Sequence, residues 1–301
     1  MSAYTMRRPL RSKAVWFSLL VMLVFSLVAV LTPWIAPHDP YKFGVTVGSL
    51  PPMWVQNTSR PGQAEYPLGT DRYGRDVLSR LLYGTRTAFF LALTAVPLAA
   101  LLGTLFGLAA GYAGGKLDSA MMILADIIQS IPGIMFMVLI VLIFRTRLTP
   151  TWFHGLLTLV IGFAAVSWVS LARLVRISVM QIKSGLFVEA AVSLGGTPAH
   201  IIWKHLLPNV MHIILVWVIN NIPAVILLEA VLGYIGIGVT WATDGSEFTV
   251  ASWGGLFYSG RSALNSNPLM LALPSLCILL ISMSFILLAD YWRGLSRPEG
   301  Y

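Results

Sequence analysis

The chain has 301 residues, of which 57% are hydrophobic and only 11% are charged. Soluble domains usually contain about 25% charged residues, so this composition excludes an ordinary soluble protein and indicates a chain that lies largely in lipid. The net charge is +8, but the basic residues lie at the ends of apolar runs and form no continuous patch with stacking aromatics. They indicate membrane topology, and we expect no binding to nucleic acid.

Long apolar runs predict the membrane-spanning helices, because a bilayer core of about 30 Å requires roughly 20 residues of helix. Lipid offers the backbone no hydrogen-bond partners, so each run must be helical. Six runs are long enough: 15–35, 87–110, 119–144, 155–177, 209–235 and 269–290. We therefore expect an all-α integral membrane protein with six transmembrane helices. The first run is too long for a cleaved signal peptide and lacks a small-residue cleavage site, so we expect it to be retained.

These runs divide the chain into three predicted parts. Residues 1–36 hold the cytoplasmic N-terminus and the first transmembrane helix. Residues 37–86 are rich in Pro, Gly, Asn and charges, which is typical of a loop on the extracytoplasmic side. Residues 87–301 form a core domain with the other five transmembrane helices.

The distribution of Lys and Arg predicts that both termini lie in the cytoplasm. With the N-terminus inside, the inner side carries Arg7, Arg8, Arg11, Lys13, Lys116, Arg173, Arg176, Lys183, Lys204, Arg293 and Arg297. The shorter outer loops carry only Arg145, Arg147 and Arg261. We therefore expect a multi-pass protein of a bacterial or archaeal cytoplasmic membrane.

A second external loop is expected from about Gly236 to Pro268. It contains Trp241, Trp253 and Tyr258, and aromatic side chains often lie at the level of the lipid headgroups. Headgroup contact and ligand contact therefore both stay open as interpretations of these residues.

The segment 184–208, between the fourth and fifth runs, is too polar and too broken to span the bilayer. Residues 187–194 predict a short helix that ends at Gly195 or Gly196, because glycine adopts the left-handed conformation without strain. We expect this helix to lie at the inner membrane surface.

A second short helix is predicted directly after it. Thr197 is a favourable N-cap and Pro198 suits the first helical position. This helix is expected to run to about Leu207, and Pro208 then begins the next span. Such a pair of short helices can lie on lipid or dock onto another protein.

The residue pattern favours docking. It resembles the EAA loop of ABC-importer permeases, a Glu-Ala-Ala triplet with a glycine four residues after the second alanine and a Leu-Pro farther on. The residues that match are Glu189, Ala190, Ala191, Gly195, Leu207 and Pro208, and Ser193 and Leu194 lie in the same predicted contact. The resemblance implies that this loop is a coupling helix that docks into a groove of a cytoplasmic ATPase. His205 stands where the family usually has isoleucine.

The chemistry of these residues agrees with a mechanical role. Small Ala190 and Ala191 allow a partner to approach closely, and Glu189 can pair with a basic group in the groove. A rigid short helix would transmit the movement of the partner to the adjoining spans. No bond-making role is expected.

The end of the first loop resembles a signature of the dipeptide, oligopeptide and nickel importer permeases (DppC/OppC type). The signature reads Leu-Gly-Thr-Asp, Gly-Arg-Asp, Ser-Arg and Gly-x-Arg, and its loop residues here are Gly69, Thr70, Asp71, Gly74, Arg75 and Asp76. Further matches follow in order at Gly111–Gly115, Asp118, Asp126, Pro132, Glu229, Leu232–Gly238, Ser252–Gly254 and Ala289–Asp290. The resemblance covers roughly residues 10–295 and implies a type I importer permease fold. It departs from the family at Ile123 and around Ser296–Pro298.

Four polar residues lie within the predicted spans. A carboxylate at the bilayer centre costs about 2.5–3.5 kcal/mol, so Asp126 and Glu229 should face the bundle interior or a polar cavity. They can carry a transported ion or form hydrogen bonds between helices. Asn220 and Asn221 can line a pathway or bond across helices, and the sequence does not choose between these roles.

Catalytic signatures are absent from the sequence. The only Gly-Lys pair, Gly115-Lys116, is followed by Leu117 and lacks the first glycine of a phosphate-binding loop. The histidines show no metal-binding spacing, and Cys277 is alone in an apolar run. We expect no enzymatic activity, no metal and no cofactor in this chain, with ATP and magnesium bound by partner subunits.

The family resemblance implies several partners. They are a second homologous permease subunit that completes a heterodimer, two cytoplasmic ABC ATPases, an extracytoplasmic solute-binding protein and the membrane lipid. Peptides are the expected cargo, with nickel chelates, glutathione or oligosaccharides as alternatives. Two other functions stay open: an ion-coupled secondary transporter that uses Asp126 or Glu229, and a membrane anchor that uses the inner loop only for docking.

Overall fold

The computed structural model describes residues 13–42, 48–56, 59–148, 156–238 and 250–295. The named elements in these residues are all helices, as expected for the all-α membrane fold. They are α1 (Lys13–Ile35), α2 (Val77–Ala113), α3 (Gly115–Ser130), α4 (Gly133–Leu148), α5 (Leu156–Lys183), α6 (Leu186–Ser193), α7 (Pro198–Ile201), the π-helix η2 (Ile202–Leu206), α8 (Leu207–Tyr234), α9 (Trp253–Gly260) and α10 (Leu269–Leu295).

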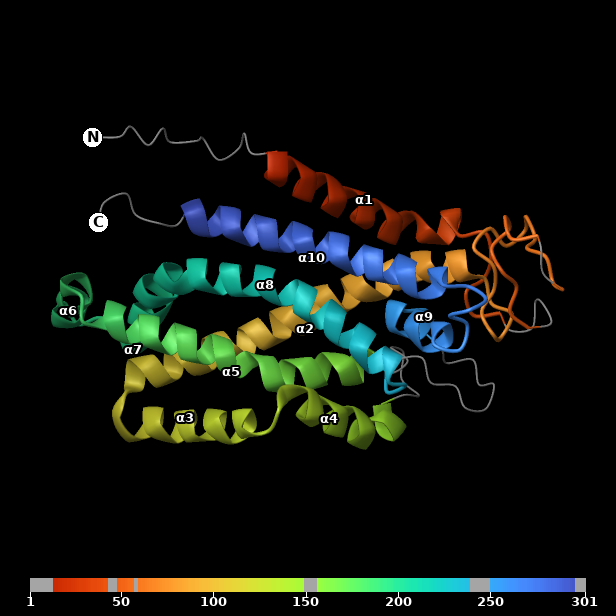
Figure 1. Ribbon diagram of the computed structural model, residues 1–301. Coiled ribbons are helices and arrows are strands. Elements are labelled where there is room, and N and C mark those ends of the chain that lie inside the picture. The colour runs from red at the N-terminus through yellow and green to blue at the C-terminus, as the bar shows by residue number, and fades with distance from the viewer. Residues whose placement is uncertain (1–12, 43–47, 57–58, 149–155, 239–249, 296–301) are drawn as a thin grey trace, which may run out of the picture.

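The long helices run alongside one another as an elongated bundle (Figure 1). Helix α6 and the C-terminal end of α10 lie at one end of the bundle, and α9 and the loop between α1 and α2 lie at the other. The two regions that the sequence singled out, the segment 184–208 and the signature loop, are therefore at opposite ends of the molecule.

Helix α2 is the central helix, and its closest partner is α5. Gly103, Gly107 and Gly111 are four residues apart and share one face of α2. A Cβ atom added at Gly107 would lie 2.6 Å from both the carbonyl oxygen of Ala172 and the Cβ of Val175. Small residues at this spacing let two membrane helices approach until their backbones touch. The sequence contained this stripe, but the spans alone did not indicate its partner.

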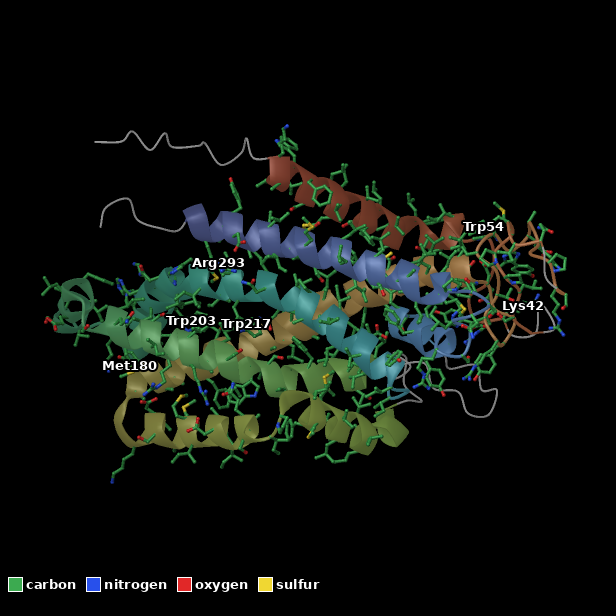
Figure 2. All side chains as sticks on the ribbon, viewed as in Figure 1. Lys42, Trp54, Met180, Trp203, Trp217 and Arg293 are labelled. Carbon is green, nitrogen blue, oxygen red and sulfur yellow. The ribbon has the colours of Figure 1, made fainter. Side chains whose placement is uncertain are left out.

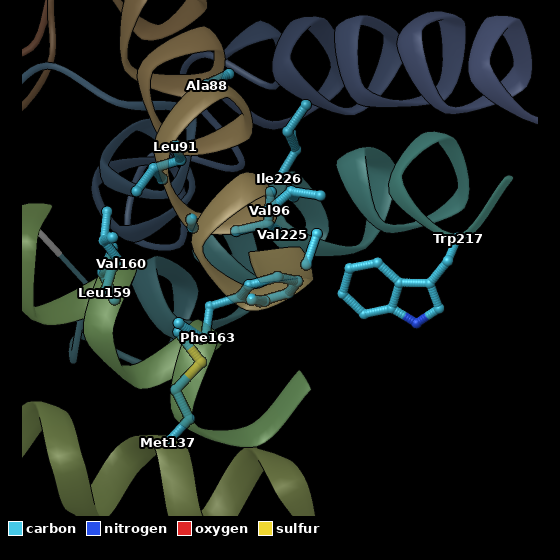
Figure 3. Packing of buried hydrophobic residues seen from close by; sticks show 14 of the residues in the cluster. Ala88, Leu91, Val96, Met137, Leu159, Val160, Phe163, Trp217, Val225 and Ile226 are labelled. Atoms are coloured by element: carbon cyan, nitrogen blue, oxygen red, sulfur yellow. The ribbon is translucent and has the colours of Figure 1, made fainter. Parts of the chain in front are cut away.

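One apolar core joins the helices around this contact. Val96 of α2, Phe163 of α5 and Ile226 of α8 are buried in the same cluster, together with Met137 of α4 (Figure 3). In contrast, α1 exposes a row of large apolar side chains, Leu20, Leu23 and Leu27 among them. An exposed apolar face of this kind is expected where a helix contacts lipid.

Five helical stretches are long and apolar enough to cross a membrane: Lys13–Ile35, Val77–Ala113, Leu156–Lys183, Pro198–Tyr234 and Leu269–Arg293. The predicted third span, 119–144, is not a continuous helix. It consists of α3 and α4, which meet at 85° and count as a sixth span only when taken together. Ile131 is extended, with ψ 130°, because a residue before proline disfavours the helical conformation, and Pro132 follows it.

The predicted helix boundary at Pro208 is also wrong. The structure continues from α7 through η2 into α8, so Pro198–Tyr234 is one helical stretch. The backbone N–H of Leu207 donates to the carbonyl of Ile202, five residues earlier. This wider turn lies directly before Pro208, whose ring would clash with a regular helix. The helix therefore passes the proline without breaking.

At the opposite end of the bundle, the structure differs from the sequence-based expectation in two places. Helix α2 begins at Val77, ten residues inside the loop predicted for 37–86, because Asp76 caps it. Trp253 is only 1% exposed and packs inside the bundle, not at the headgroups. Its Nε1 donates to the carbonyl of Leu81 at 3.1 Å, and its ring contacts that of Phe25 edge-on.

Several predictions fall outside the described residues. They concern Arg7, Arg8, Arg11, Trp241, Arg297 and the departure at Ser296–Pro298.

We expect Gly107→Leu to destabilise the protein by about 1–3 kcal/mol, because the new side chain must push α5 away from α2. Ala109→Leu adds side-chain volume on the exposed face of the same helix and serves as the matched control. Thermal unfolding in detergent, followed by size-exclusion chromatography, measures the difference. Equal melting temperatures for the two variants would contradict the close α2–α5 contact.

Candidate functional site

The segment between α5 and α8 folds as the sequence predicts at its first helix. Helix α6 covers Leu186–Ser193, and Gly195 has φ +82°, the left-handed conformation that favours glycine. The N–H groups of Leu194 and Gly196 donate to the carbonyls of Ala190 and Ala191, both at 3.0 Å. These bonds close the end of the helix.

The second predicted helix also begins at the expected residue. Thr197 is the N-cap of α7, and its hydroxyl accepts a hydrogen bond from the N–H of His200 at 3.3 Å. Pro198 occupies the first turn, as predicted. The ring of Phe187 on α6 lies 6.2 Å from that of His205 on η2, so the two helices touch through aromatic side chains.

Only a few side chains anchor this segment to the rest of the protein. Val188, Ile201 and Leu206 are each at most 2% exposed and join the main core. They hold α6 and η2 against the bundle. The outer side of the segment is therefore free to meet another molecule.

That outer side is apolar. Leu186 and Leu194 are 83% and 89% exposed, and Phe187, Val192 and Trp203 are at least half exposed. Figure 2 shows Trp203 at the end of the bundle that carries α6. Because water disfavours such a cluster of large apolar side chains, it is typical of a surface that another protein or lipid covers.

The residues of the matched triplet lie beside this apolar surface. Glu189 and Ala190 are exposed, and Ala191 is half-buried. Ser193 is exposed, and its hydroxyl donates to the backbone carbonyl of Glu189 at 3.0 Å. Farther on, Leu207 is half-buried and Pro208 is exposed.

At the opposite end, the signature loop is built on one carboxylate. The Asp71 side chain accepts hydrogen bonds from the N–H of Tyr73 and of Arg75, and the Arg75 guanidinium contacts it at 2.7–2.8 Å. Arg80, on the first turns of α2, lies 3.7 Å from the same carboxylate. Asp71 and Arg80 are both fully buried. The two arginines therefore share a single buried counter-charge.

The next aspartate begins α2. Asp76 caps the helix by accepting from the N–H and the hydroxyl of Ser79, at 2.9 and 2.6 Å. His38 stacks on the ring of Tyr66 and lies 3.6 Å from Asp76. Burial and the negative charge of Glu65 raise the pKa of Tyr66, so this phenol stays neutral at physiological pH.

The remaining signature residues fold the loop back on itself. Thr70 accepts a hydrogen bond from the N–H of Leu50 at 2.9 Å. Gly69 leaves no room for a side chain, because a Cβ atom there would lie 2.3 Å from the carbonyl oxygen of Leu50. The N–H of Gly74 donates to the carbonyl of Asp71 and closes the turn. The signature residues thus form a buried cluster of charged side chains with tight backbone turns.

Glu229 forms a contact between helices. It is buried in α8, and its Oε2 accepts from the N–H of Gly254, in the first turn of α9, at 3.2 Å. The positive N-terminal end of a helix favours a carboxylate there. Gly233 and Gly254 are packed so closely that a Cβ atom on Gly233 would lie 2.3 Å from Gly254. Glu229 therefore joins α8 to α9 through an interhelical hydrogen bond, beside a close glycine contact.

Two ion pairs between α3 and α5 escaped the sequence-based prediction. Arg176 forms a two-pronged pair with Asp118, and Arg173 pairs with Asp126 at 2.5 Å. The spacing of three residues between the arginines puts both on one face of α5. The partners are 47 and 58 residues apart in sequence, so only the packing of α3 on α5 reveals the pairs.

The two asparagines of α8 bond mainly within their own helix. The amides of Asn220 and Asn221 donate to the carbonyls of Val216 and Trp217, four residues earlier, at 2.8 Å. The side-chain oxygen of Asn220 also accepts from Arg293 of α10 at 3.3 Å. Within the described part of the chain, no group of three or more His, Cys, Asp or Glu residues could hold a metal ion.

Comparison with known protein families gives two matches for this chain. Residues 103–299 match the family described as binding-protein-dependent transport system inner membrane component, and residues 2–52 match the N-terminal TM domain of oligopeptide transport permease C.

Individual relatives resemble nearly the whole chain. The dipeptide transport system permease protein DppC of Bacillus subtilis is 31% identical and aligns with 97% of this chain and 84% of its own length. The di/tripeptide transport system permease protein DppC of Pseudomonas aeruginosa is 33% identical over 93% of this chain and 86% of its own. The oligopeptide transport system permease protein OppC of Haemophilus influenzae is 30% identical, with 93% and 83% covered.

We expect Asp71→Asn to cost about 3–5 kcal/mol of stability, because it leaves the buried Arg80 without its counter-charge. Glu65→Gln, at a side chain that is 65% exposed, is the control and should be nearly neutral. The double variant Asp71→Asn/Arg80→Met should recover part of the loss. The unfolding temperature in detergent measures the stability of all three variants. An unchanged value for Asp71→Asn alone would show that the buried charge cluster does not stabilise the protein.

Proposed function

The chain belongs to the family of binding-protein-dependent transport system inner membrane components, and from this premise we propose that it is the permease subunit of an ATP-driven peptide importer. The proposal is supported by two features of different origin. The relatives with nearly full-length similarity are named as dipeptide and oligopeptide transport permeases. The described residues 184–208 also carry exposed large apolar side chains at one end of the bundle.

The coupling segment, residues 184–208, is the observation that carries the mechanism. Leu186, Leu194 and Trp203 would insert into a groove of a cytoplasmic ATPase, and Glu189 would pair with a basic group at its edge. Covering each leucine removes a large apolar side chain from water, which stabilises the complex by about 1.5–3 kcal/mol. The groove would thereby hold the segment while the ATPase moves.

Movement would reach the pathway through the two helices that flank the segment. Helix α5 enters it at Lys183, and α7 leads through η2 into α8 without a break. Because Val188 and Leu206 fix the segment to the core, a displacement of α6 must shift the ends of α5 and α8. The segment therefore acts as a lever and forms no covalent bond.

The other subunits complete the proposed assembly. A second homologous permease would form the pathway with this chain, two ATPases would supply ATP and magnesium, and a solute-binding protein would deliver cargo at the opposite end. This arrangement puts both termini and the coupling segment in the cytoplasm. The chain itself would catalyse no reaction.

Gly195→Pro and Glu189→Lys should each uncouple ATP hydrolysis from uptake in the reconstituted transporter. Proline cannot adopt the positive φ of Gly195, and the lysine reverses the charge offered to the groove. Uptake of labelled dialanine into proteoliposomes should fall while the purified chain still inserts and elutes as a folded protein. Glu65→Lys, at the far end, is the control. Normal ATP-driven uptake by both coupling variants would refute the proposed mechanism.

Leu194→Asp should weaken binding of the chain to the ATPase about tenfold to 100-fold, the factor that follows from losing one buried leucine side chain. Leu23→Asp, on the exposed face of α1, is the control because it makes the same change at another exposed leucine away from the segment, 57% exposed against 89% for Leu194. Co-purification at graded concentrations measures the affinity. Equal affinity for the two variants would show that Leu194 is not part of the contact.

The cargo class needs its own measurement. Labelled dialanine should be taken up, and unlabelled peptides should compete with it. Inhibition by a nickel chelate, glutathione or an oligosaccharide, with none by peptides, would replace the peptide proposal while leaving the importer proposal intact.

A further inference from the structure

An ion pair lies on an exposed face of helices α3 and α5. The side chains of Asp126 on α3 and Arg173 on α5 are 67% and 40% exposed. Arg173 precedes Lys183, the last residue of α5, by ten residues, or about 15 Å of helix. Helix α5 has 28 residues, or about 42 Å of helix, and is longer than a hydrocarbon core of about 30 Å. The pair therefore lies in the half of the bundle nearer α6.

Further polar groups continue from this pair across α8 to α10. Ser170, one turn before Arg173, is exposed and accepts a hydrogen bond from Nε1 of Trp217 at 3.0 Å. Asn220, one turn beyond Trp217, contacts Arg293. Figure 2 shows Trp217 and Arg293 in the half of the bundle nearer α6. These six residues, Asp126, Ser170, Arg173, Trp217, Asn220 and Arg293, are called the polar band.

A cavity lies along part of this polar band. Its volume is about 320 Å³, and Leu174, His212, Trp217, Asn220 and Arg293 are among its lining residues. Small-molecule sites typically occupy about 300–1,000 Å³ and combine apolar walls with a few polar groups. The cavity has both the size and the composition of such a site.

Lipid would penalise the exposed charges of the polar band. A charged side chain that faces hydrocarbon costs up to about 2.5–3.5 kcal/mol, the value at the bilayer centre. The exposed face of α1 differs from the polar band, because Leu20, Leu23 and Leu27 present only apolar side chains there. Exposed charges of both signs on α3 and α5 therefore favour contact with water or cargo over contact with lipid on this side of the bundle.

We propose that the polar band lines the translocation pathway and contacts the charged termini of a zwitterionic peptide. The inference rests on the proposed importer function and adds the residues that meet the cargo. Arg173 and Arg293 suit a carboxylate, Asp126 suits an ammonium group, and Asn220 and Ser170 suit peptide groups. Because Asp126 and Arg173 neutralise each other when no cargo is present, the wall binds weakly enough for the cargo to leave.

The first test measures contact with water. In a Cys277→Ala background, single cysteines replace Ser170 and Asn220, and Leu23→Cys serves as the lipid-facing control. A positively charged methanethiosulfonate is added to the assembled transporter in proteoliposomes permeabilised to the reagent. Only a thiolate reacts, and it forms only in water, so both band positions should react at least about tenfold faster than the control. Rates equal to that of Leu23→Cys would overturn the pathway assignment.

The second test measures recognition of charge. Arg173→Gln should raise the KM for dialanine uptake about tenfold to 100-fold, whereas the KM for the C-terminal amide of dialanine should not change. Asp126→Asn should act in the same way on the free amine, compared with the N-acetyl derivative. Lys13→Gln, which removes a cation from α1, is the control and should alter neither KM.

The outcomes separate this inference from the proposed function. ATP-driven uptake with an unchanged KM in both polar-band variants would contradict the proposed cargo contact and leave the importer proposal intact. Absence of ATP-driven uptake by the unaltered complex would contradict the importer proposal itself. Equal loss for dialanine and its blocked derivatives would assign the ion pair to structure and contradict recognition of the termini.

Discussion

The close contact between α2 and α5 is the constraint on which the rest of the structure depends. In lipid, apolar side chains gain little by meeting one another, so helices associate through tight packing and internal polar bonds. The glycines of α2 permit this packing, since Gly103 and Gly107 leave the backbone of α5 within reach. Helix α2 carries the signature loop at its start, and α5 leads into the segment 184–208 at its end. The contact thus links the signature loop with this segment.

The two ends of the bundle differ in the kind of side chain that they bury. The signature loop buries its charges, with Asp71 facing both Arg75 and Arg80, and this holds α2 at a fixed position. The segment 184–208 does the reverse and leaves the apolar side chains of Leu186 and Leu194 uncovered. A rigid end suits reception of a delivered solute, and an end with uncovered apolar side chains suits attachment to a motor protein.

Polar groups within the spans fall into two kinds by their environment. Glu229 and Asp118 are buried and bonded to neighbouring helices, so they fix the packing of α9 and α3. Asp126 and Arg173 are paired but exposed. Glu229 and Asp126 look alike in sequence, as single carboxylates in apolar runs. Their exposure depends on which helices cover them, and helix order along the chain does not specify this.

The sequence by itself determined the membrane class, the position of most spans and the local turns of the coupling segment, because chain-local physics controls them. Hydrocarbon demands long apolar helices, Thr197 and Pro198 start a helix, and Gly195 takes a positive φ. Only the tertiary structure decided the 85° bend after Ser130, the unbroken passage through Pro208 and the burial of Trp253. It also decided the partners of Asp118 and Asp126. Each of these depends on packing between segments far apart in the chain, where one helix supplies the surface or charge that another lacks.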